Sequence, residues 1–144
     1  MHLRFVLRRI ALFSNIITLF ITPASAQEVV IHEIMAHPQA VAGREPTELE
    51  YLELANLSDQ LVDLSGWQLD RGVTFTFPSE TNLEAGGFLV IVADPEAFAL
   101  RYPEVAKPIG PWVGRLGNSG NTIRLVNRSK ETVDQVAYSD EGDW

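Results

Sequence analysis

Three acidic residues close together, Glu48, Glu50 and Glu53, are the first candidates for chemistry, because neighbouring carboxylates can bind a divalent cation or share a proton. Side chains alternate across a strand, so Glu50 and Glu53 are expected on opposite faces, where they cannot share an ion. Glu48 and Glu50 are expected on one face, and we interpret this pair as a solvated strand surface. The alternative is a weak calcium site, although the Asp/Asn/Gly-rich loop of a strong calcium motif is missing from the sequence.

The histidines and the other strand carboxylates predict structural contacts rather than catalysis. Glu33 and Glu53 occupy strand parities that apolar residues share, so we expect them to be partly buried. A buried carboxylate needs hydrogen bonds, which backbone groups or a Trp or Tyr donor would supply. His32 and His37 are five positions apart, and this spacing does not assemble a zinc site. We therefore predict no metal ligands.

Motifs for nucleophilic catalysis and phosphate binding are also missing. The chain has no Gly-x-Ser-x-Gly sequence, and the segment Gly117–Gly120 lacks the lysine of a phosphate-binding loop, so we interpret it as a turn. We predict that the protein is not an enzyme, with no catalytic residue, no cofactor-binding residue and no cofactor.

The first 26 residues have the features of a signal peptide. Three arginines precede an uncharged apolar stretch over 10–21, and small residues at Ala24 and Ala26 suit a signal peptidase. The stretch is about a dozen residues, shorter than the ~20 that span a bilayer as a helix, so we expect cleavage after Ala26 rather than an uncleaved anchor. The mature chain is then expected outside the cytoplasm, either secreted or held in the periplasm or at the cell surface, with no other membrane span.

The net charge of the remaining chain disfavours some classes of binding partner. Without the three N-terminal arginines, eight basic residues stand against 19 acidic ones, a formal charge of −11 that repels nucleic acids and anionic lipids. Arg115, Arg124, Arg128 and Lys130 gather near the end of the sequence. We interpret them as a solvated hairpin, with a positive edge that meets DNA or a sulfated or acidic glycan as the alternative. We therefore do not expect general nucleic-acid binding.

Alternating apolar residues and turn signals predict an all-β domain over 27–144. The run 88–93 is continuously apolar, so we place it at the centre of the fold with both faces covered. Asp94 as an N-cap, followed by Pro95, predicts one short helix over about 94–102. The predicted strands, which would form an antiparallel β-sandwich, span 29–35, 50–56, 61–64, 67–69, 73–77, 88–93, 121–127 and 132–138.

Aromatic residues are expected to fill the space between the two sheets of this sandwich. Trp112 and Trp144 lie in irregular sequence, and we expect them to pack over an open end of the sandwich, with exposure to a partner as the alternative. The residues assigned to the core are Trp67, Phe75, Phe77 and Phe88.

Several runs of the sequence resemble a known family. Val30–Met35, Glu50–Asn56 and Val62–Trp67, in this order, are similar to the lamin tail domain in its bacterial, exported form. Similar runs continue to Tyr138, so the resemblance covers nearly all of the mature chain. His32 is a departure, because related sequences often carry Asn there. The resemblance implies an immunoglobulin-like β-sandwich without catalytic residues of its own.

These observations predict a non-catalytic interaction or attachment module outside the cytoplasm that works through strand edges and loops. Its expected partner is a protein or a component of the cell surface or matrix. The alternative is an N-terminal targeting or spacer domain of a larger secreted hydrolase or nuclease, whose catalytic part would lie beyond residue 144.

Overall fold

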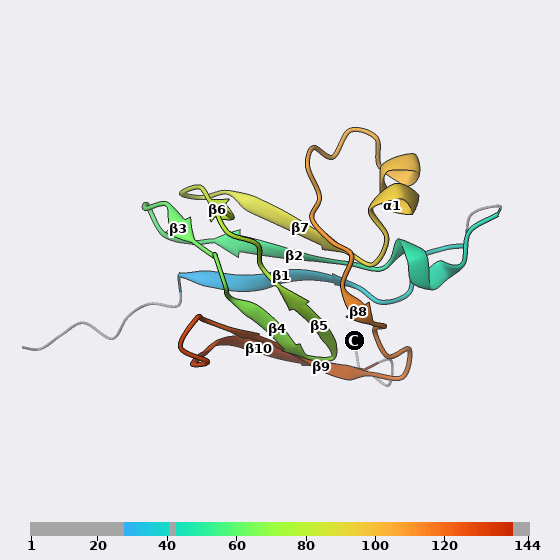
Figure 1. Ribbon diagram of the computed structural model, residues 1–144. Coiled ribbons are helices and arrows are strands. Elements are labelled where there is room, and N and C mark those ends of the chain that lie inside the picture. Colours follow the sequence, from blue (N-terminus) through green and yellow to red (C-terminus); the bar gives the residue numbers. More distant parts are fainter. Residues whose placement is uncertain (1–27, 41–42, 140–144) are drawn as a thin grey trace, which may run out of the picture.

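Two antiparallel β-sheets face each other across a hydrophobic core in the computed structural model, which describes residues 28–40 and 43–139 (Figure 1). The first sheet has the order β1-β2-β7 and consists of β1 (Val29–Met35), β2 (Tyr51–Asn56) and β7 (Phe88–Val92). The second sheet has the order β10-β9-β4-β5-β8. Its strands are β4 (Gln68–Arg71), β5 (Val73–Thr76), β8 (Val113–Gly114), β9 (Asn121–Val126) and β10 (Thr132–Tyr138). A further antiparallel pair joins β3 (Val62–Asp63) to β6 (Asn82–Leu83).

Alternation along the strands sends apolar side chains into the space between the sheets. In β5, Val73 and Phe75 are buried while Thr74 and Thr76 are exposed, which is the pattern of a strand with one face toward solvent. The prediction of an all-β antiparallel sandwich is confirmed. The large apolar side chains that are fully buried are Leu49, Leu52, Leu54, Leu64, Leu69, Phe77, Ile91, Phe98, Leu116, Ile123 and Leu125.

Most of the aromatic core prediction is confirmed. The rings of Phe75 and Phe77 pack edge to face with centroids 5.2 Å apart, and Trp67 is half-buried against the same core. Trp112 is 6% exposed, so it packs inside rather than facing a partner. Trp144 lies outside the described residues.

The position of strand β7 differs from the one predicted for the apolar run 88–93. It lies at an edge of its sheet rather than at the centre of the fold, and Phe88 at its start is 59% exposed, so the assignment of Phe88 to the core is wrong. The continuous apolar sequence of β7 is explained by the surroundings of its second half. Ile109 forms a parallel bridge with Ile91, and its backbone makes hydrogen bonds of 2.9 Å with Val90 and Val92. Ile91 and Val92, whose side chains point to opposite faces, are both 0% exposed, so this half of β7 is covered on both faces while its start is not.

The one α-helix within the described ranges, α1 (Pro95–Arg101), begins as its sequence predicts. The Asp94 carboxylate accepts hydrogen bonds from the backbone N–H groups of Glu96 (2.8 Å) and Ala97 (3.0 Å), which satisfies donors that a helix leaves free at its start. A single 3-10 turn, η1 (Pro46–Leu49), was not expected, because four residues are too few to show a helical period. The two-residue strands β6 and β8 escaped prediction for the same reason.

Two local irregularities bring the first and last strands together. The pairing of β1 with β2 shifts register around His32, and the pairing of β10 with β9 shifts between Thr132 and Asp134. The Asp134 carboxylate then accepts a hydrogen bond of 2.7 Å from the backbone N–H of Ile31. A side chain of β10 therefore binds a backbone donor of β1, which lies at the edge of its own sheet.

None of the helices over 28–40 and 43–139 is long and apolar enough to cross a membrane. The predicted signal peptide over 1–26 and its cleavage site lie outside the described residues.

Candidate interaction surface

The outer face of the first sheet presents an exposed ring. In β2, Leu52 and Leu54 point into the core. Side chains alternate along a strand, so Glu53 and Ala55 point outward. The strand register places Val90 beside Glu53, and Phe88 and Val30 on either side of Ala55. We call this surface the Phe88 face; its residues are Val30, His32, Glu53, Ala55, Phe88 and Val90.

Contacts across three strands order the Phe88 face. The rings of His32 and Phe88 lie with centroids 5.3 Å apart and an interplanar angle of 59°, and Ala55 of the strand between them is 2% exposed. His32 Nδ1 lies 2.9 Å from the Glu53 Oε1 atom. The result is an apolar centre with a polar rim, which is the usual anatomy of a protein-binding patch.

The other end of the same sheet face is covered by α1. Tyr51 packs edge to face against Phe98 and Tyr102, with ring centroids 5.5 Å and 5.9 Å away. Its hydroxyl donates a hydrogen bond of 2.6 Å to Glu33 Oε1. Burial and the Glu33 carboxylate raise the pKa of Tyr51 above its ordinary value. The expected Tyr donor for Glu33 is therefore confirmed, although the Glu33 residue itself is exposed rather than partly buried.

The Glu48–Glu50 pair is not the solvated surface that the sequence suggested. Glu50 is 1% exposed, and its Oε2 atom accepts a hydrogen bond of 2.8 Å from the backbone N–H of Leu116. Its Oε1 atom is buried without a hydrogen-bond partner among the described residues, and this burial raises the pKa of the Glu50 carboxyl. The signal was present in the sequence, because Glu50 shares its strand parity with the buried residues Leu52 and Leu54. The prediction that Glu50 and Glu53 point to opposite faces is confirmed.

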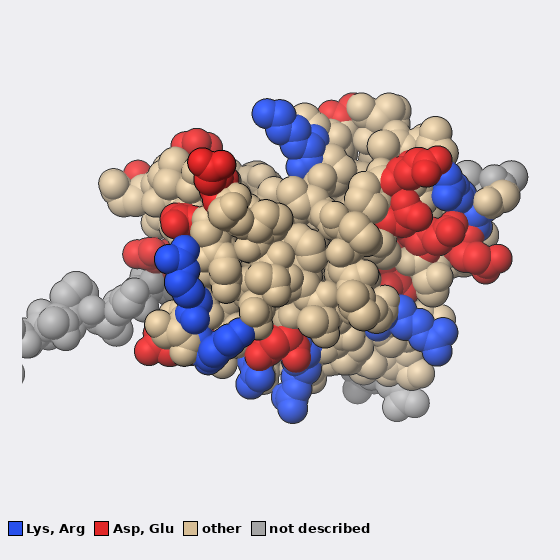
Figure 2. Space-filling model, in the orientation of Figure 1, with Lys and Arg blue, Asp and Glu red and all other residues tan. Residues whose placement is uncertain are grey.

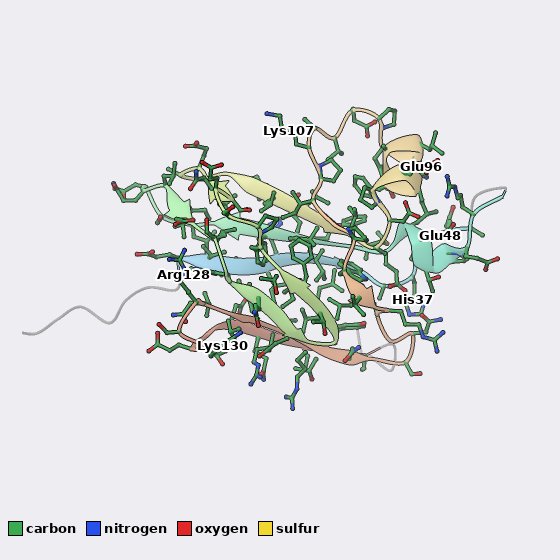
Figure 3. All side chains as sticks on the ribbon, viewed as in Figure 1. His37, Glu48, Glu96, Lys107, Arg128 and Lys130 are labelled. Atoms are coloured by element: carbon green, nitrogen blue, oxygen red, sulfur yellow. The ribbon has the colours of Figure 1, made fainter. Side chains whose placement is uncertain are left out.

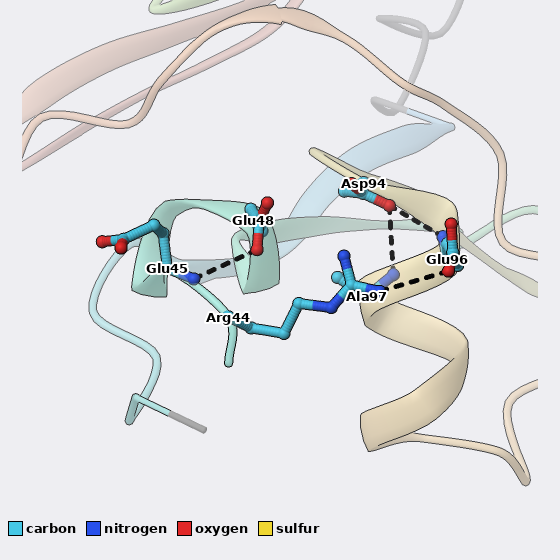
Figure 4. Close-up of polar contacts among 6 residues, drawn as sticks. All are labelled: Arg44, Glu45, Glu48, Asp94, Glu96 and Ala97. Atoms are coloured by element: carbon cyan, nitrogen blue, oxygen red, sulfur yellow. Dashed lines mark hydrogen bonds and ion pairs between the residues drawn. The ribbon is translucent and has the colours of Figure 1, made fainter. Parts of the chain in front are cut away.

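Acidic side chains near η1 and α1 hold backbone groups instead of an ion. Glu48 Oε2 accepts a hydrogen bond of 3.0 Å from the N–H of Glu45 (Figure 4). Asp94 accepts a hydrogen bond from the N–H of Glu96 in the same way at the start of α1. Arg44 forms an ion pair of 3.2 Å with Glu96 in the same region. Over the part of the chain that the structure describes, no group of three or more His, Cys, Asp or Glu residues could hold a metal ion.

His37 also makes a structural contact. His37 Nε2 lies 2.7 Å from the carbonyl oxygen of Asn118, within the predicted turn Gly117–Gly120. Tyr138 donates a hydrogen bond of 3.1 Å to the Gly117 carbonyl. A Cβ atom on Gly117 would lie 2.5 Å from the Gly120 carbonyl oxygen, so this turn requires glycine at its start. The interpretation of the segment as a turn is confirmed.

The basic residues near the end of the chain do not form one uninterrupted positive edge. Arg124 makes two hydrogen bonds to Asp70, of 2.8 Å and 3.0 Å, and this guanidinium lowers the pKa of the Asp70 carboxyl. Lys130 contacts Gln68, and Arg115 lies apart, in the segment after β8. On the face shown in Figure 2, several basic side chains lie along the lower edge of the second sheet with an acidic patch among them, while acidic ones gather near η1 and α1. This pairing favours the interpretation as a solvated hairpin.

A comparison with known families adds to this geometry. Residues 22–140 match the model of the lamin tail domain, which is an immunoglobulin-like fold. The match confirms both the resemblance and the immunoglobulin-like sandwich expected from the sequence. No curated protein matches the chain.

Proposed function

Because the chain belongs to the lamin tail domain family, we propose that it is a non-catalytic interaction module that acts outside the cytoplasm. It attaches to a protein or to a component of the cell surface or matrix, and it needs no cofactor. The N-terminal segment over 1–26, with its basic start, short apolar stretch and small residues, supports export.

The observation that carries this proposal is the Phe88 face. A phenyl ring that is 59% exposed at the start of an edge strand has a cost in water that a bound partner would relieve. Aromatic anchors surrounded by polar residues are typical centres of protein interfaces. His32 and Glu53 supply such polar neighbours, and their mutual contact holds the His32 ring beside Phe88.

Several acidic side chains bind backbone groups of the fold, which supports the proposal of a module without catalysis. Glu50 binds the backbone of the segment after β8, Glu48 binds the first residue before η1, and Asp94 caps α1. A carboxylate that holds backbone donors in the folded state is poorly placed to exchange protons with a substrate. These groups stabilise the sandwich that presents the Phe88 face.

Site-specific crosslinking in an exporting bacterial host tests the proposal. The full chain would carry a photoreactive phenylalanine analogue at position 88 in one variant and at position 74 in the other. Thr74 is the matched control, because it is an exposed strand residue on the outer face of the second sheet. We expect the exported protein to begin at Gln27 and to form crosslinks from position 88 that position 74 does not form.

Two outcomes would contradict the proposal. Retention of the chain in the cytoplasm would exclude the extracytoplasmic role. Equal crosslinking from positions 88 and 74, together with unchanged attachment of a Phe88→Ser variant, would exclude the Phe88 face as the binding surface.

A further inference from the structure

A small hollow lies between two turns at one end of the sandwich. The β3–β4 connection and the β9–β10 turn border this hollow, which is shallow and open to solvent and has a volume of about 320 Å³. This volume is at the lower end of the ~300–1,000 Å³ of small-molecule sites. Figure 3 shows Arg128 and Lys130 at this end of the second sheet. The residues that line the hollow are Asp63, Trp67, Asn127, Arg128 and Ser129.

The polar walls of the hollow are held in place before any ligand arrives. Arg128 donates two hydrogen bonds to the Ser65 carbonyl, of 3.0 Å from Nε and 2.8 Å from Nη2. Asp63 Oδ1 accepts a hydrogen bond of 2.8 Å from the Ser65 N–H, and Asp63 Oδ2 lies 3.6 Å from Arg128 Nη2. Gly66 has a φ of +75°, a backbone conformation that favours glycine, so the turn beside Arg128 depends on this residue. Such ordering lowers the entropy cost of binding.

The second turn is equally fixed. Asn127 Oδ1 accepts hydrogen bonds from the backbone N–H groups of Ser129 (2.9 Å) and Glu131 (3.0 Å), and its Nδ2 atom donates to Glu131 Oε2 at 2.7 Å. The Asn127 side chain is therefore used within the turn. Ser129 and Arg128 are exposed, so their side chains can face a ligand.

We propose that this hollow binds one neutral hexose unit of a polysaccharide. A hexose has an apolar C–H face and a rim of hydroxyl groups that both donate and accept hydrogen bonds. Trp67, half-buried against the core, supplies a flat apolar wall for the C–H face. Asp63 can accept from two hydroxyl groups, and the Arg128 fork has N–H donors beyond the two that Ser65 uses.

The charges in the hollow select against other ligands. Asp63 and Arg128 carry opposite charges at close range, so the site has no net charge for an ion to neutralise. The Asp63 carboxylate would repel a sulfated or uronic sugar, and the Arg128 guanidinium would repel a divalent cation. The hollow shares no residue with the Phe88 face, so this activity goes beyond the proposed function.

Nuclear magnetic resonance titration of the exported, ¹⁵N-labelled protein tests the inference. The probes are cellotetraose, chitotriose and maltotriose, each taken to about 10 mM, which nearly fills a site with a dissociation constant of about 1 mM. We expect at least one probe to shift the Trp67 indole N–H and the amides of Ser65 and Ser129 to saturation. Arg128→Ala and Asp63→Ala should each weaken that binding at least tenfold.

Matched variants separate recognition from loss of structure. Lys130→Ala removes a cation from the same turn but not from the lining, so its affinity should stay within twofold of the wild type. Asp63→Asn keeps an acceptor for the Ser65 N–H and should fold normally while losing affinity. Phe88→Ser should leave the titration unchanged, so failure of this inference is distinguishable from failure of the proposed function.

Three results would overturn the inference. The first is that no probe shifts these resonances at about 10 mM, where a site with a dissociation constant of about 1 mM would be mostly occupied. The second is that Arg128→Ala and Asp63→Asn bind as tightly as the wild type. The third is that a heparin-derived disaccharide binds more tightly than every neutral probe, which would assign the hollow to anionic sugars.

Discussion

The His32 and Phe88 rings meet with centroids 5.3 Å apart, although β2 separates the strands that carry them. Their contact depends on the residue between them, Ala55, whose methyl group is small enough to lie beneath both rings and is 2% exposed. The register shift around His32 is the second requirement, because it places two consecutive residues of β1 against one position of β2. The Phe88 face is thus built by three strands together.

Two phenylalanines provide a matched test that separates the hydrophobic core from the proposed binding surface. Phe77 is 1% exposed and Phe88 is 59% exposed. We expect Phe77→Ala to lower the free energy of unfolding by about 3–5 kcal/mol, the usual cost of emptying a large aromatic site in a core. Phe88→Ala should cost under about 1 kcal/mol, because the ring keeps most of its contact with water in the folded state. Urea unfolding of the two variants measures both values, and equal losses would place Phe88 in the core after all.

Glu50→Gln is expected to change how stability depends on pH. Burial raises the folded-state pKa of Glu50 above its ordinary value of 4.5, so the unfolded chain releases this proton first as pH rises. The stability of the wild type should therefore fall through the window between pH 4.5 and that raised folded-state value. Gln keeps an acceptor for the Leu116 N–H but has no charge to bury. The stability of Glu50→Gln relative to the wild type should rise from pH 4 to pH 7 in urea unfolding, and a flat difference would contradict the assignment.

Asp134→Ala should open the contact between the first and last strands. The bond that Asp134 accepts from the Ile31 N–H is partly buried, and loss of a hydrogen bond to a charged group costs about 1–3 kcal/mol. Asp134→Asn keeps an acceptor oxygen and should lose less. Amide hydrogen exchange at Ile31 measures the effect at the site itself. If exchange there were unchanged in Asp134→Ala, the bond would not protect the edge of β1.

Calcium and chelators should not change thermal stability. The carboxylates of Glu48, Glu50 and Asp94 already hold backbone N–H groups, so a cation would have to displace those contacts. We expect the midpoint of thermal unfolding to move by less than about 1 °C with millimolar calcium or with a chelator, since a ligand that prefers the folded state must raise that midpoint. A rise of many degrees with calcium would restore the cation-site hypothesis, and Glu48→Gln would then identify the ligand.

Regular alternation made part of the fold predictable. The bounds of β1 at Val29–Met35 and of β10 at Thr132–Tyr138 follow from the sequence, because each strand has seven residues of recognisable β pattern. The two-residue strands β6 and β8 carry no such pattern. Their pairing depends on backbone positions that distant parts of the chain determine.

The candidate surface was less predictable than the fold. An apolar run such as that of β7 looks the same in the sequence whether its start is covered or exposed, and Ile109, which pairs with the second half of the strand, comes from a loop. The contact of His32 with Phe88 requires a register shift that no residue type signals. Glu50 is different, since its parity with Leu52 and Leu54 already indicated the inner face.

The bond between Ile31 and Asp134 also limits the order in which the domain assembles. The two residues are 103 positions apart, so the edge of the first strand gains this contact only after nearly the whole domain has been made. Closing so long a loop is slow and entropically costly, which delays the final structure. Under the proposed export, late closure would be an advantage, because the chain would stay extended until its last strand had crossed the membrane.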